Sequence, residues 1–412
     1  MKRRQFITNS ILASAGSLLI PNFLKALELQ SPNVLTNHKK LIIIQLSGGN
    51  DGLNTVVPYH NDIYYKLRPD IAIEKTKILT LNDELGLNPV MLGLKNLYDD
   101  GMLSIINNVG YPNPDRSHFR SMDIWQTASG ADEYLSTGWL GRCLDVQCTQ
   151  TNIQSQIQNQ IKCLPHYAIE VDDTLSLAMK GELSKALAVQ DAKKLFQATR
   201  PVFLKTMQPQ ISETHTQGHD NVSYLYKTLA ETVSSAEYLY DTSKIQKTKG
   251  TYATGEFGKR IKTIAELILS GVQTQIFYVS LSGFDTHIRQ NEKQAKLLEE
   301  YATSVAALIE DLKANGLLDN VLVMTFSEFG RRVAQNGSNG TDHGTANQVF
   351  LMGNKLRKKG FYNAAPNLTD LDEGDLKFTI DFRNVYADVL KNWLAINPNL
   401  ILGQSFEGLG IV

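Results

Sequence analysis

Short apolar runs, rich in β-branched residues, recur along the chain and end at glycine or polar residues. The first, at 41–46, stops at the sequence Ser-Gly-Gly-Asn-Asp-Gly of 47–52. An apolar run of this length between turn residues is typical of a strand that is buried on both faces of a parallel sheet. The same pattern predicts strands at 102–109, 275–281, 320–327 and 348–352.

Helical spacing of apolar residues fills the stretches between these strands. It predicts helices at 117–128, 255–270, 292–315 and 384–396, the last opened by Asp381. The segment 173–247 is also mostly helical in pattern, and we expect a helical insertion around 150–250. Alternating strands and helices predict an α/β fold with a mainly parallel sheet sandwiched by helices. In such folds, functional groups gather beyond the carboxyl ends of the strands.

The first residues differ from the rest of the chain. Three basic residues at 2–4 precede a weakly apolar stretch at 7–20. A basic head and a run of this length are typical of a secretory signal, and the Arg-Arg pair resembles a twin-arginine signal. We therefore expect a twin-arginine-type signal peptide at 1–26, a single α/β domain at 36–412, and a periplasmic or secreted protein that meets the twin-arginine export machinery. An ordinary amphipathic N-terminal helix is the alternative.

The composition is typical of a folded protein, and the net charge favours no highly charged partner. The chain has 412 residues, of which 42% are hydrophobic and 20% charged, in the range of globular proteins. The formal net charge of −1 gives no general attraction to nucleic acid or to an anionic membrane. We therefore expect no nucleic-acid partner and no transmembrane segment in the mature chain.

Polar clusters adjoin several of the predicted strands. They are Gly-Asn-Asp-Gly at 49–52, Ser-Gly-Phe-Asp-Thr-His at 282–287, Ser-Glu-Phe-Gly-Arg-Arg at 327–332 and Gly-Thr-Asp-His-Gly at 340–344. Each has a plain structural explanation when taken alone, since Asp51 suits a turn and Glu328 can pair with Arg331. A parallel sheet, however, brings the ends of its strands to one edge, so these carboxylates and imidazoles would share a small volume.

Such a concentration of acids and imidazoles predicts a metal site. Carboxylates that are packed closely raise one another's pKa, and a divalent cation removes the conflict. Asp285 and His287 are two residues apart, so in an extended segment they project to the same side. Oxygen and imidazole ligands without thiolate suit zinc, manganese, magnesium or calcium. The alternative is a polar edge with a purely structural role.

The segment Asp-Arg-Ser-His-Phe-Arg at 115–120 carries a candidate nucleophile. Ser117 would lie at a helix N-terminus, where free N–H groups and the helix dipole favour an anion. A serine oxygen near a metal can attack phosphorus or sulfur, and Arg116 or Arg120 could hold the tetrahedral oxyanion. The alternative is that Ser117 or Asp115 only caps the helix and that the arginines lie on the surface.

Taken together, these motifs resemble an exported bacterial family catalogued as domain of unknown function 1501. The resemblance covers essentially the whole mature chain. Besides the twin-arginine leader it rests on Leu-Ser-Gly-Gly-Asn-Asp-Gly (46–52), Pro-Asp-Arg-Ser-His-Phe (114–119), Phe-Asp-Thr-His (284–287), Ser-Glu-Phe-Gly-Arg (327–331) and Thr-Asp-His-Gly-Thr-Ala-Asn (341–347). The family is similar in turn to the alkaline phosphatase and sulfatase superfamily of metal-dependent hydrolases. An alkaline-phosphatase-like fold is therefore implied.

The resemblance also implies roles for individual residues. The nucleophile would be Ser117. Two metal positions are implied, the first formed by Asp51 and Glu328 beside that serine, and the second formed by Asp285, His287 and His343.

This sequence departs from the superfamily pattern at two points. Alkaline phosphatases have a histidine where Phe329 stands, and their aspartate and histidine of the second site are four residues apart rather than two. His118 is a candidate replacement for the missing imidazole. Phe119 and Ser121 stand where a sulfatase needs proline and arginine to modify its nucleophile, which argues against a formylglycine enzyme.

Two functions from different classes fit this sequence. The first is an exported metal-dependent hydrolase of phosphate or sulfate esters, small or polymer-linked, in which a nucleophilic serine attacks and the metal stabilises the oxyanion. The second is a non-catalytic binding or assembly protein that keeps the superfamily scaffold. Phe329 favours the second function, and the density of aspartate and histidine favours the first.

Overall fold

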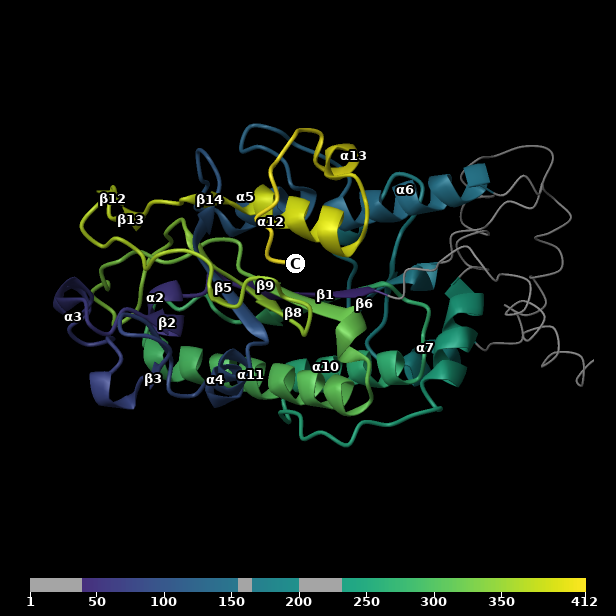
Figure 1. Cartoon of the computed structure of the whole chain (residues 1–412), viewed down its shortest axis with the longest axis horizontal. Coiled ribbons are helices and arrows are strands. Elements are labelled where there is room, and N and C mark those ends of the chain that lie inside the picture. Colours follow the sequence, from purple (N-terminus) through teal and green to yellow (C-terminus); the bar gives the residue numbers. More distant parts are fainter. Residues whose placement is uncertain (1–38, 155–164, 200–231) are drawn as a thin grey trace, which may run out of the picture. The chain divides into compact units, whose positions relative to one another are not determined.

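The apolar run at 41–46 forms an inner strand of a nine-stranded sheet, within the residues that the computed structural model describes, 39–154, 165–199 and 232–412. Eight strands follow the order β11-β5-β10-β9-β1-β8-β6-β7, and β14 pairs with β5 (Figure 1). Their bounds are β1 (Lys40–Ser47), β5 (Leu103–Gly110), β6 (Ala168–Glu170), β7 (Leu187–Ala188), β8 (Ile276–Ser282), β9 (Val321–Phe326), β10 (Asn347–Met352), β11 (Gly360–Phe361) and β14 (Ile380–Asp381).

The sheet is mainly parallel, which confirms the predicted α/β fold. β1 is parallel to both of its neighbours, β8 and β9, and β6 is parallel to β8 and to β7. β10 is the exception and runs antiparallel to β9 and β5. The connection from β9 to β10, at 327–346, contains no helix. A direct return without a crossover helix places the second strand antiparallel to the first.

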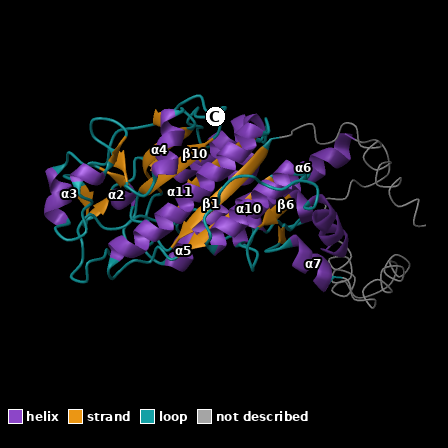
Figure 2. Cartoon of the chain, turned by 90° about the horizontal axis from the view of Figure 1, so that it is seen from below, coloured by secondary structure: helices purple, strands orange, loops and turns teal. Residues whose placement is uncertain are grey.

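Helices cover both faces of the sheet, as predicted (Figures 1 and 2). Side chains alternate along β1, so that Ile42 and Ile44 enter one core while Leu41 and Ile43 enter the other. The first core packs against α4 (Leu92–Asp99), α10 (Glu256–Leu269) and α11 (Gln290–Ala314). The second packs against α5 (His118–Thr127), α6 (Trp139–Gln154), α12 (Phe382–Asp388) and α13 (Pro398–Leu402).

The predicted helices are present. Those expected at 117–128, 255–270 and 292–315 correspond to α5, α10 and α11. Asp381 caps α12, because its side chain accepts the backbone N–H of Arg383 at 2.9 Å. Beyond α12 the predicted helix continues as one turn of π-helix at Val389–Trp393 and ends there.

Within its described residues, the predicted helical insertion is only partly helical. The described residues between 150 and 250 include α7 (Ala192–Ala198) and a helix at 232–242, but also β6 and β7, which extend the main sheet. These strands have three and two residues, too few to give an alternating or continuous apolar pattern. The rest of the expected insertion lies outside the described residues.

All described residues belong to one structural unit, Lys39–Val412. The predicted signal peptide at 1–26 lies outside them. Among the described helices, none is long and apolar enough to cross a membrane.

A buried carboxyl group in the sheet gives a prediction for the dependence of stability on pH. Burial raises the pKa of Glu170, at the end of β6, from its ordinary value of 4.5 to about 7, although a hydrogen bond from the Ser176 N–H at 2.7 Å opposes the shift. A folded-state pKa above the unfolded value contributes stability that is fully present below about pH 4.5 and is lost as pH rises through 7. Urea unfolding of Glu170→Gln should therefore show little change at pH 4 and stabilisation by up to about 3 kcal/mol at pH 8.

The exposed Glu182 offers a control, because Glu182→Gln should leave the pH dependence of the wild type unchanged. An unchanged pH dependence in Glu170→Gln would show that this carboxyl titrates normally in the folded protein.

Candidate metal centre

The topology of the sheet gathers the predicted polar clusters at one edge. The carboxyl ends of β1, β8 and β9 lie side by side because these strands are parallel neighbours. β10 runs the other way, so the segment before it, which carries His343, reaches the same edge. β5 is antiparallel to β10, so the segment that leads from β5 to His118 and α5 also starts there.

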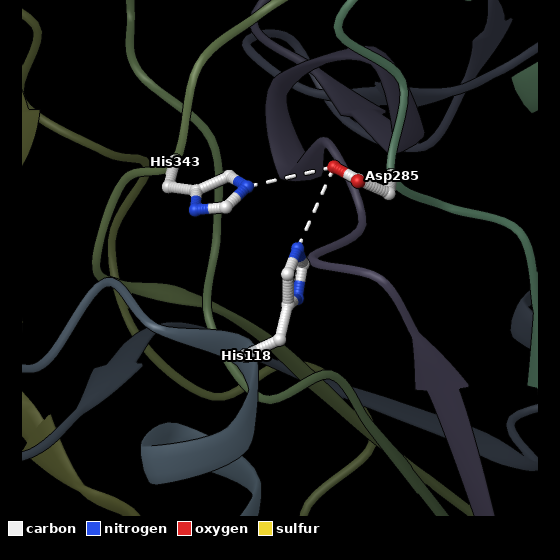
Figure 3. A group of neighbouring side chains, drawn as sticks. All are labelled: His118, Asp285 and His343. Carbon is white, nitrogen blue, oxygen red and sulfur yellow. Dashed lines mark ion pairs between the residues drawn. The ribbon is translucent and has the colours of Figure 1, made fainter.

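At this edge His118, Asp285 and His343 face one another (Figure 3). One ligand atom from each lies within 4.8 Å of the others. The Nε2 atoms of His118 and His343 are each 3.5 Å from Oδ1 of Asp285. A tetrahedral ion with bonds of about 2.0–2.2 Å separates its ligand atoms by about 3.3–3.5 Å. The spacing of the three side chains therefore suits a shared cation.

His287 adds a third imidazole beside this group. Its Nε2 lies 3.1 Å from Oδ1 of Asp285 and 2.9 Å from Nε2 of His343. Asp285 and His287 follow β8 on the same loop, and their side chains do meet, as their spacing predicted. We therefore name His118, Asp285, His287 and His343 the histidine group.

The outer nitrogen of each imidazole in the histidine group is held by an oxygen acceptor. Because carboxylate and carbonyl oxygens accept only, each Nδ1 donates its proton outward, and Nε2 turns a lone pair inward. Metal-bound histidines are usually oriented by the same outer bond. The pairs are His118 with Glu328 at 2.9 Å, His287 with Asp342 at 3.1 Å, and His343 with the carbonyl of Arg116 at 2.7 Å.

The inward-facing nitrogens are incompletely satisfied within the described residues. There, Nε2 of His118 is buried and has no hydrogen-bond partner, and Nε2 of His287 has a donor only in Nη1 of Arg331, at 3.5 Å. The Nε2 atoms of His287 and His343 stand 2.9 Å apart, where two lone pairs repel unless a proton or another cation lies beside them. A buried polar atom without a partner is costly. A divalent cation coordinated by His118, His343 and Asp285 would give the inward nitrogens of these two imidazoles a partner.

Burial and neighbouring charges shift the pKa values of residues in the histidine group. Burial alone would raise the pKa of Asp285, but the hydrogen bond and charge of Arg331, with the neighbouring imidazoles, lower it to about 2. The hydrogen bond to Glu328 raises the pKa of His118. Burial lowers the pKa of His343, and the charge of Arg331 adds to the effect. Asp285 is therefore ionised at neutral pH, and burial favours the neutral form of His343.

Arg331 joins the loops that carry the histidine group. Its side chain is fully buried and donates to Asp285 Oδ1 at 2.8 Å. It also donates to the backbone carbonyls of Gly48, Gly49, Phe284 and Thr341. One guanidinium thus connects the segments after β1 and β8 to the segment before β10. All its donors are used within the protein, so Arg331 holds the loops rather than a substrate.

Gly48 and Gly49 allow the backbone to pass close to this group. Their φ angles are +116° and +67°, which side chains rarely allow. A Cβ at Gly48 would collide with the backbone nitrogen of Asp285, and one at Gly49 with the ring of Phe329. Phe329 is buried and packs on the rings of His118 and His343. Its ring centroid lies 4.7 Å from that of His118 and 4.8 Å from that of His343. It forms a wall of the site, where the resemblance led us to expect an imidazole.

Asp51 does not join the histidine group. Its carboxylate contacts both terminal nitrogens of Arg68, at 2.5 and 3.1 Å, and both side chains have no exposed area. Asp51 also accepts from the Gln290 amide and caps the short helix α2 (Gly52–Thr55). Nor does Glu328 share a ligand position with Asp51, since it accepts instead from His118 and from the Gly48 N–H at 2.8 Å. In this structure each of the two carboxylates is therefore engaged by its own protein partners.

The three candidate catalytic residues lie in different surroundings. Ser117 is exposed directly before His118, and its hydroxyl makes no hydrogen bond within the described residues. Arg116 pairs with Asp375 at 2.5 Å and remains partly exposed. Arg120 is turned away, because its guanidinium donates to the carbonyls of the loop at 130–133. Ser117 and Arg116 therefore stay candidates for catalysis, and Arg120 has a structural role.

Sequence reasoning missed several residues that build the site. Asp342, which orients His287, was visible as the neighbour of His343 in the motif at 341–347. Arg68 and Gln290, which surround Asp51, had no signal, since Arg68 only follows a short helix at 62–67 and Gln290 only begins α11. Side chains that complete a buried polar network are set by tertiary packing, which local pattern does not encode.

Glu328 gives a prediction for metal affinity. Glu328→Gln keeps the shape of the side chain but removes the charge that supports the donated proton of His118. Loss of such an outer partner should weaken zinc binding about 10–100-fold. Competition with a chelating dye measures this change, and Glu84→Gln, at an exposed position, is the control. Equal zinc affinity in the two variants would show that Glu328 does not orient a ligand.

Comparison with known proteins identifies the family. Similar solved structures include a zinc complex of the C-terminal periplasmic domain of EptC from Escherichia coli (12% identity, 77% of this chain and 73% of that chain, TM-score 0.37). Others are the lipoteichoic acid synthase LtaP from Listeria monocytogenes (12%, 80% and 69%, 0.31) and the sulfatase PsFucS1 from Pseudoalteromonas sp. (9%, 95% and 74%, 0.35). No curated protein matches the sequence. The sequence profile of the family described as Protein of unknown function (DUF1501) matches residues 104–393, more than half of the chain, and the protein therefore belongs to this family, as its motifs predicted.

Proposed function

We propose that this protein is an exported metal-dependent hydrolase of phosphate or sulfate esters. The observation that carries the proposal is the histidine group, in which three imidazole nitrogens face one carboxylate and each ring is fixed by an outer acceptor. The likeness of the motifs to a superfamily of ester hydrolases supports the reaction class. The twin-arginine-type leader at 1–26 supports a periplasmic or secreted location.

The ligand set favours zinc or manganese. Calcium and magnesium prefer sites made entirely of oxygen, whereas imidazole suits zinc and other transition ions. Three of the four side chains in the histidine group present nitrogen. When bound there, such an ion would polarise an ester oxygen and lower the pKa of a nearby hydroxyl.

In the proposed reaction Ser117 supplies the nucleophile. Its Oγ attacks the phosphorus or sulfur, the bond to the alcohol oxygen breaks, and the proton lost by the serine balances the one gained by the leaving alcohol. Water then attacks the serine ester, releases phosphate or sulfate and restores the hydroxyl. Arg116, which is partly exposed one residue before Ser117, would bind the remaining oxygens.

Assays on the purified full chain test this proposal. Nitrophenyl phosphate, bis-nitrophenyl phosphate and nitrophenyl sulfate should be offered with and without a chelator. We expect turnover that the chelator abolishes, that zinc or manganese restores, and that Ser117→Ala removes while Ser136→Ala, at another exposed serine, retains it. Metal-free protein without turnover on any of the three esters would rule the enzyme out.

A second candidate is a non-catalytic binding or assembly protein. It is favoured by the ion pair between Arg331 and Asp285, because Asp285 already has one cationic partner within the chain. In that case the protein would bind metal without chelator-sensitive turnover.

A further inference from the structure

Four carboxylates lie at the sheet edge: Asp51, Asp285, Glu328 and Asp342. We infer that they serve a single divalent ion, bound at Asp285, and that the guanidinium of Arg68 takes the place of a second cation at Asp51. The inference rests on the proposed metal site and fixes how many ions that site holds. It replaces the two metal positions that the resemblance implied.

Asp51 is already neutralised inside the protein. Arg68 contacts both of its oxygens, and neither side chain reaches solvent. Arg68 is itself fixed, because it donates to the carbonyls of Arg332 and Val333 at 2.9 and 2.8 Å. The Gln290 amide and the Leu53 N–H occupy the remaining acceptor directions of the carboxylate. A metal ion at Asp51 would have to displace a buried guanidinium and leave it without a partner, which is costly.

Glu328 and Asp342 are also engaged, each as the outer partner of an imidazole. Glu328 is fully buried and accepts from His118 Nδ1 and Gly48 N–H. Asp342 accepts from His287 Nδ1 and from the Asn336 amide, both at 3.1 Å. Each carboxylate therefore orients a ligand. Asp285 differs, since half of its side chain is exposed and three Nε2 atoms lie within 3.5 Å of its Oδ1.

The charge balance at the edge agrees with one ion. An imidazole that binds a metal is neutral, so in the loaded site four carboxylates and the two buried guanidinium groups of Arg68 and Arg331 leave two negative charges. One divalent ion neutralises these two charges. A second divalent ion would leave an excess of two positive charges beside the first ion, where like charges repel.

Metal counting tests the inference. The full chain is saturated with Zn²⁺ or Mn²⁺, passed through gel filtration with a weak chelator, and analysed for metal. We expect one equivalent in the wild type and one in the double variant Asp51→Asn with Arg68→Gln, which removes both charges of the pair together. Asp285→Asn should retain less than a tenth of an equivalent.

Electron paramagnetic resonance of the Mn²⁺-loaded wild type gives a readout that does not depend on folding of a variant. An isolated ion gives uncoupled spectra, and a second ion nearby gives spin-coupled ones. Two retained equivalents, or a coupled spectrum, would overturn the inference while leaving the proposed hydrolase standing. Absence of retained metal in the wild type would overturn the hydrolase, and the inference with it.

Discussion

Asp285→Asn should abolish both metal retention and ester hydrolysis while the fold persists. Asparagine keeps an oxygen that can accept from Arg331, but the negative charge at the centre of the histidine group is lost. A metal ion contributes several kcal/mol to stabilising the transition state, and about 1.4 kcal/mol corresponds to a factor of ten. We therefore expect kcat/KM to fall by about 10³-fold or more, together with loss of bound zinc.

The control for this variant is Asp83→Asn, at an exposed position between β3 (Leu79–Thr80) and β4 (Gly86–Leu87), which belong to a separate small sheet. It should leave activity and metal content unchanged. Thermal unfolding of the metal-free proteins distinguishes a loss of ligand from a loss of fold. Full zinc retention in Asp285→Asn would show that this carboxylate is not a ligand.

Arg331→Met should cause the largest loss of stability among single changes near the centre. The guanidinium is completely buried and serves Asp285 and four backbone carbonyls on three segments. Methionine fills similar space but leaves the four carbonyls without the donors of the guanidinium. Each buried acceptor that is left unsatisfied costs about 1–3 kcal/mol, so we expect a loss of at least about 3 kcal/mol. Urea unfolding of the metal-free protein measures the change.

The neighbouring Arg332 provides a matched control for this measurement. Its side chain is 39% exposed, and its nearest carboxylate oxygen, on Asp375, is 3.7 Å away. Exposed ion pairs contribute about 0–1 kcal/mol, so Arg332→Met should cost little. If the two variants were equally stable, Arg331 would not be the residue that holds the loops together.

The sheet could be predicted because its strands carry continuous apolar runs that end at glycine or polar residues. β1, β8 and β9 have this pattern, and each appears where the sequence placed it. The direction of β10 could not be predicted, since apolar pattern does not encode whether a strand is parallel. The strands β6 and β7 are too short to show a pattern at all.

Sheet topology alone could predict which loops meet at the site. Parallel strands bring their ends together, and this rule predicted that Asp285, His287 and His343 would lie at one edge, where the structure also has His118. It could not tell which carboxylates would face the group and which would find another partner. Asp51 follows β1 as expected, but its carboxylate is paired with Arg68, which follows the helix α3 (Asp62–Leu67). Such long-range pairing becomes visible only in three dimensions.

The most direct test of the shared cation is a crystal structure of the zinc-loaded protein with anomalous scattering data at the zinc edge. We predict one strong anomalous peak at about 2.0–2.2 Å from Nε2 of His118, Nε2 of His343 and a carboxylate oxygen of Asp285. A map without a peak among these three side chains, or with its strongest peak at Asp51, would contradict it.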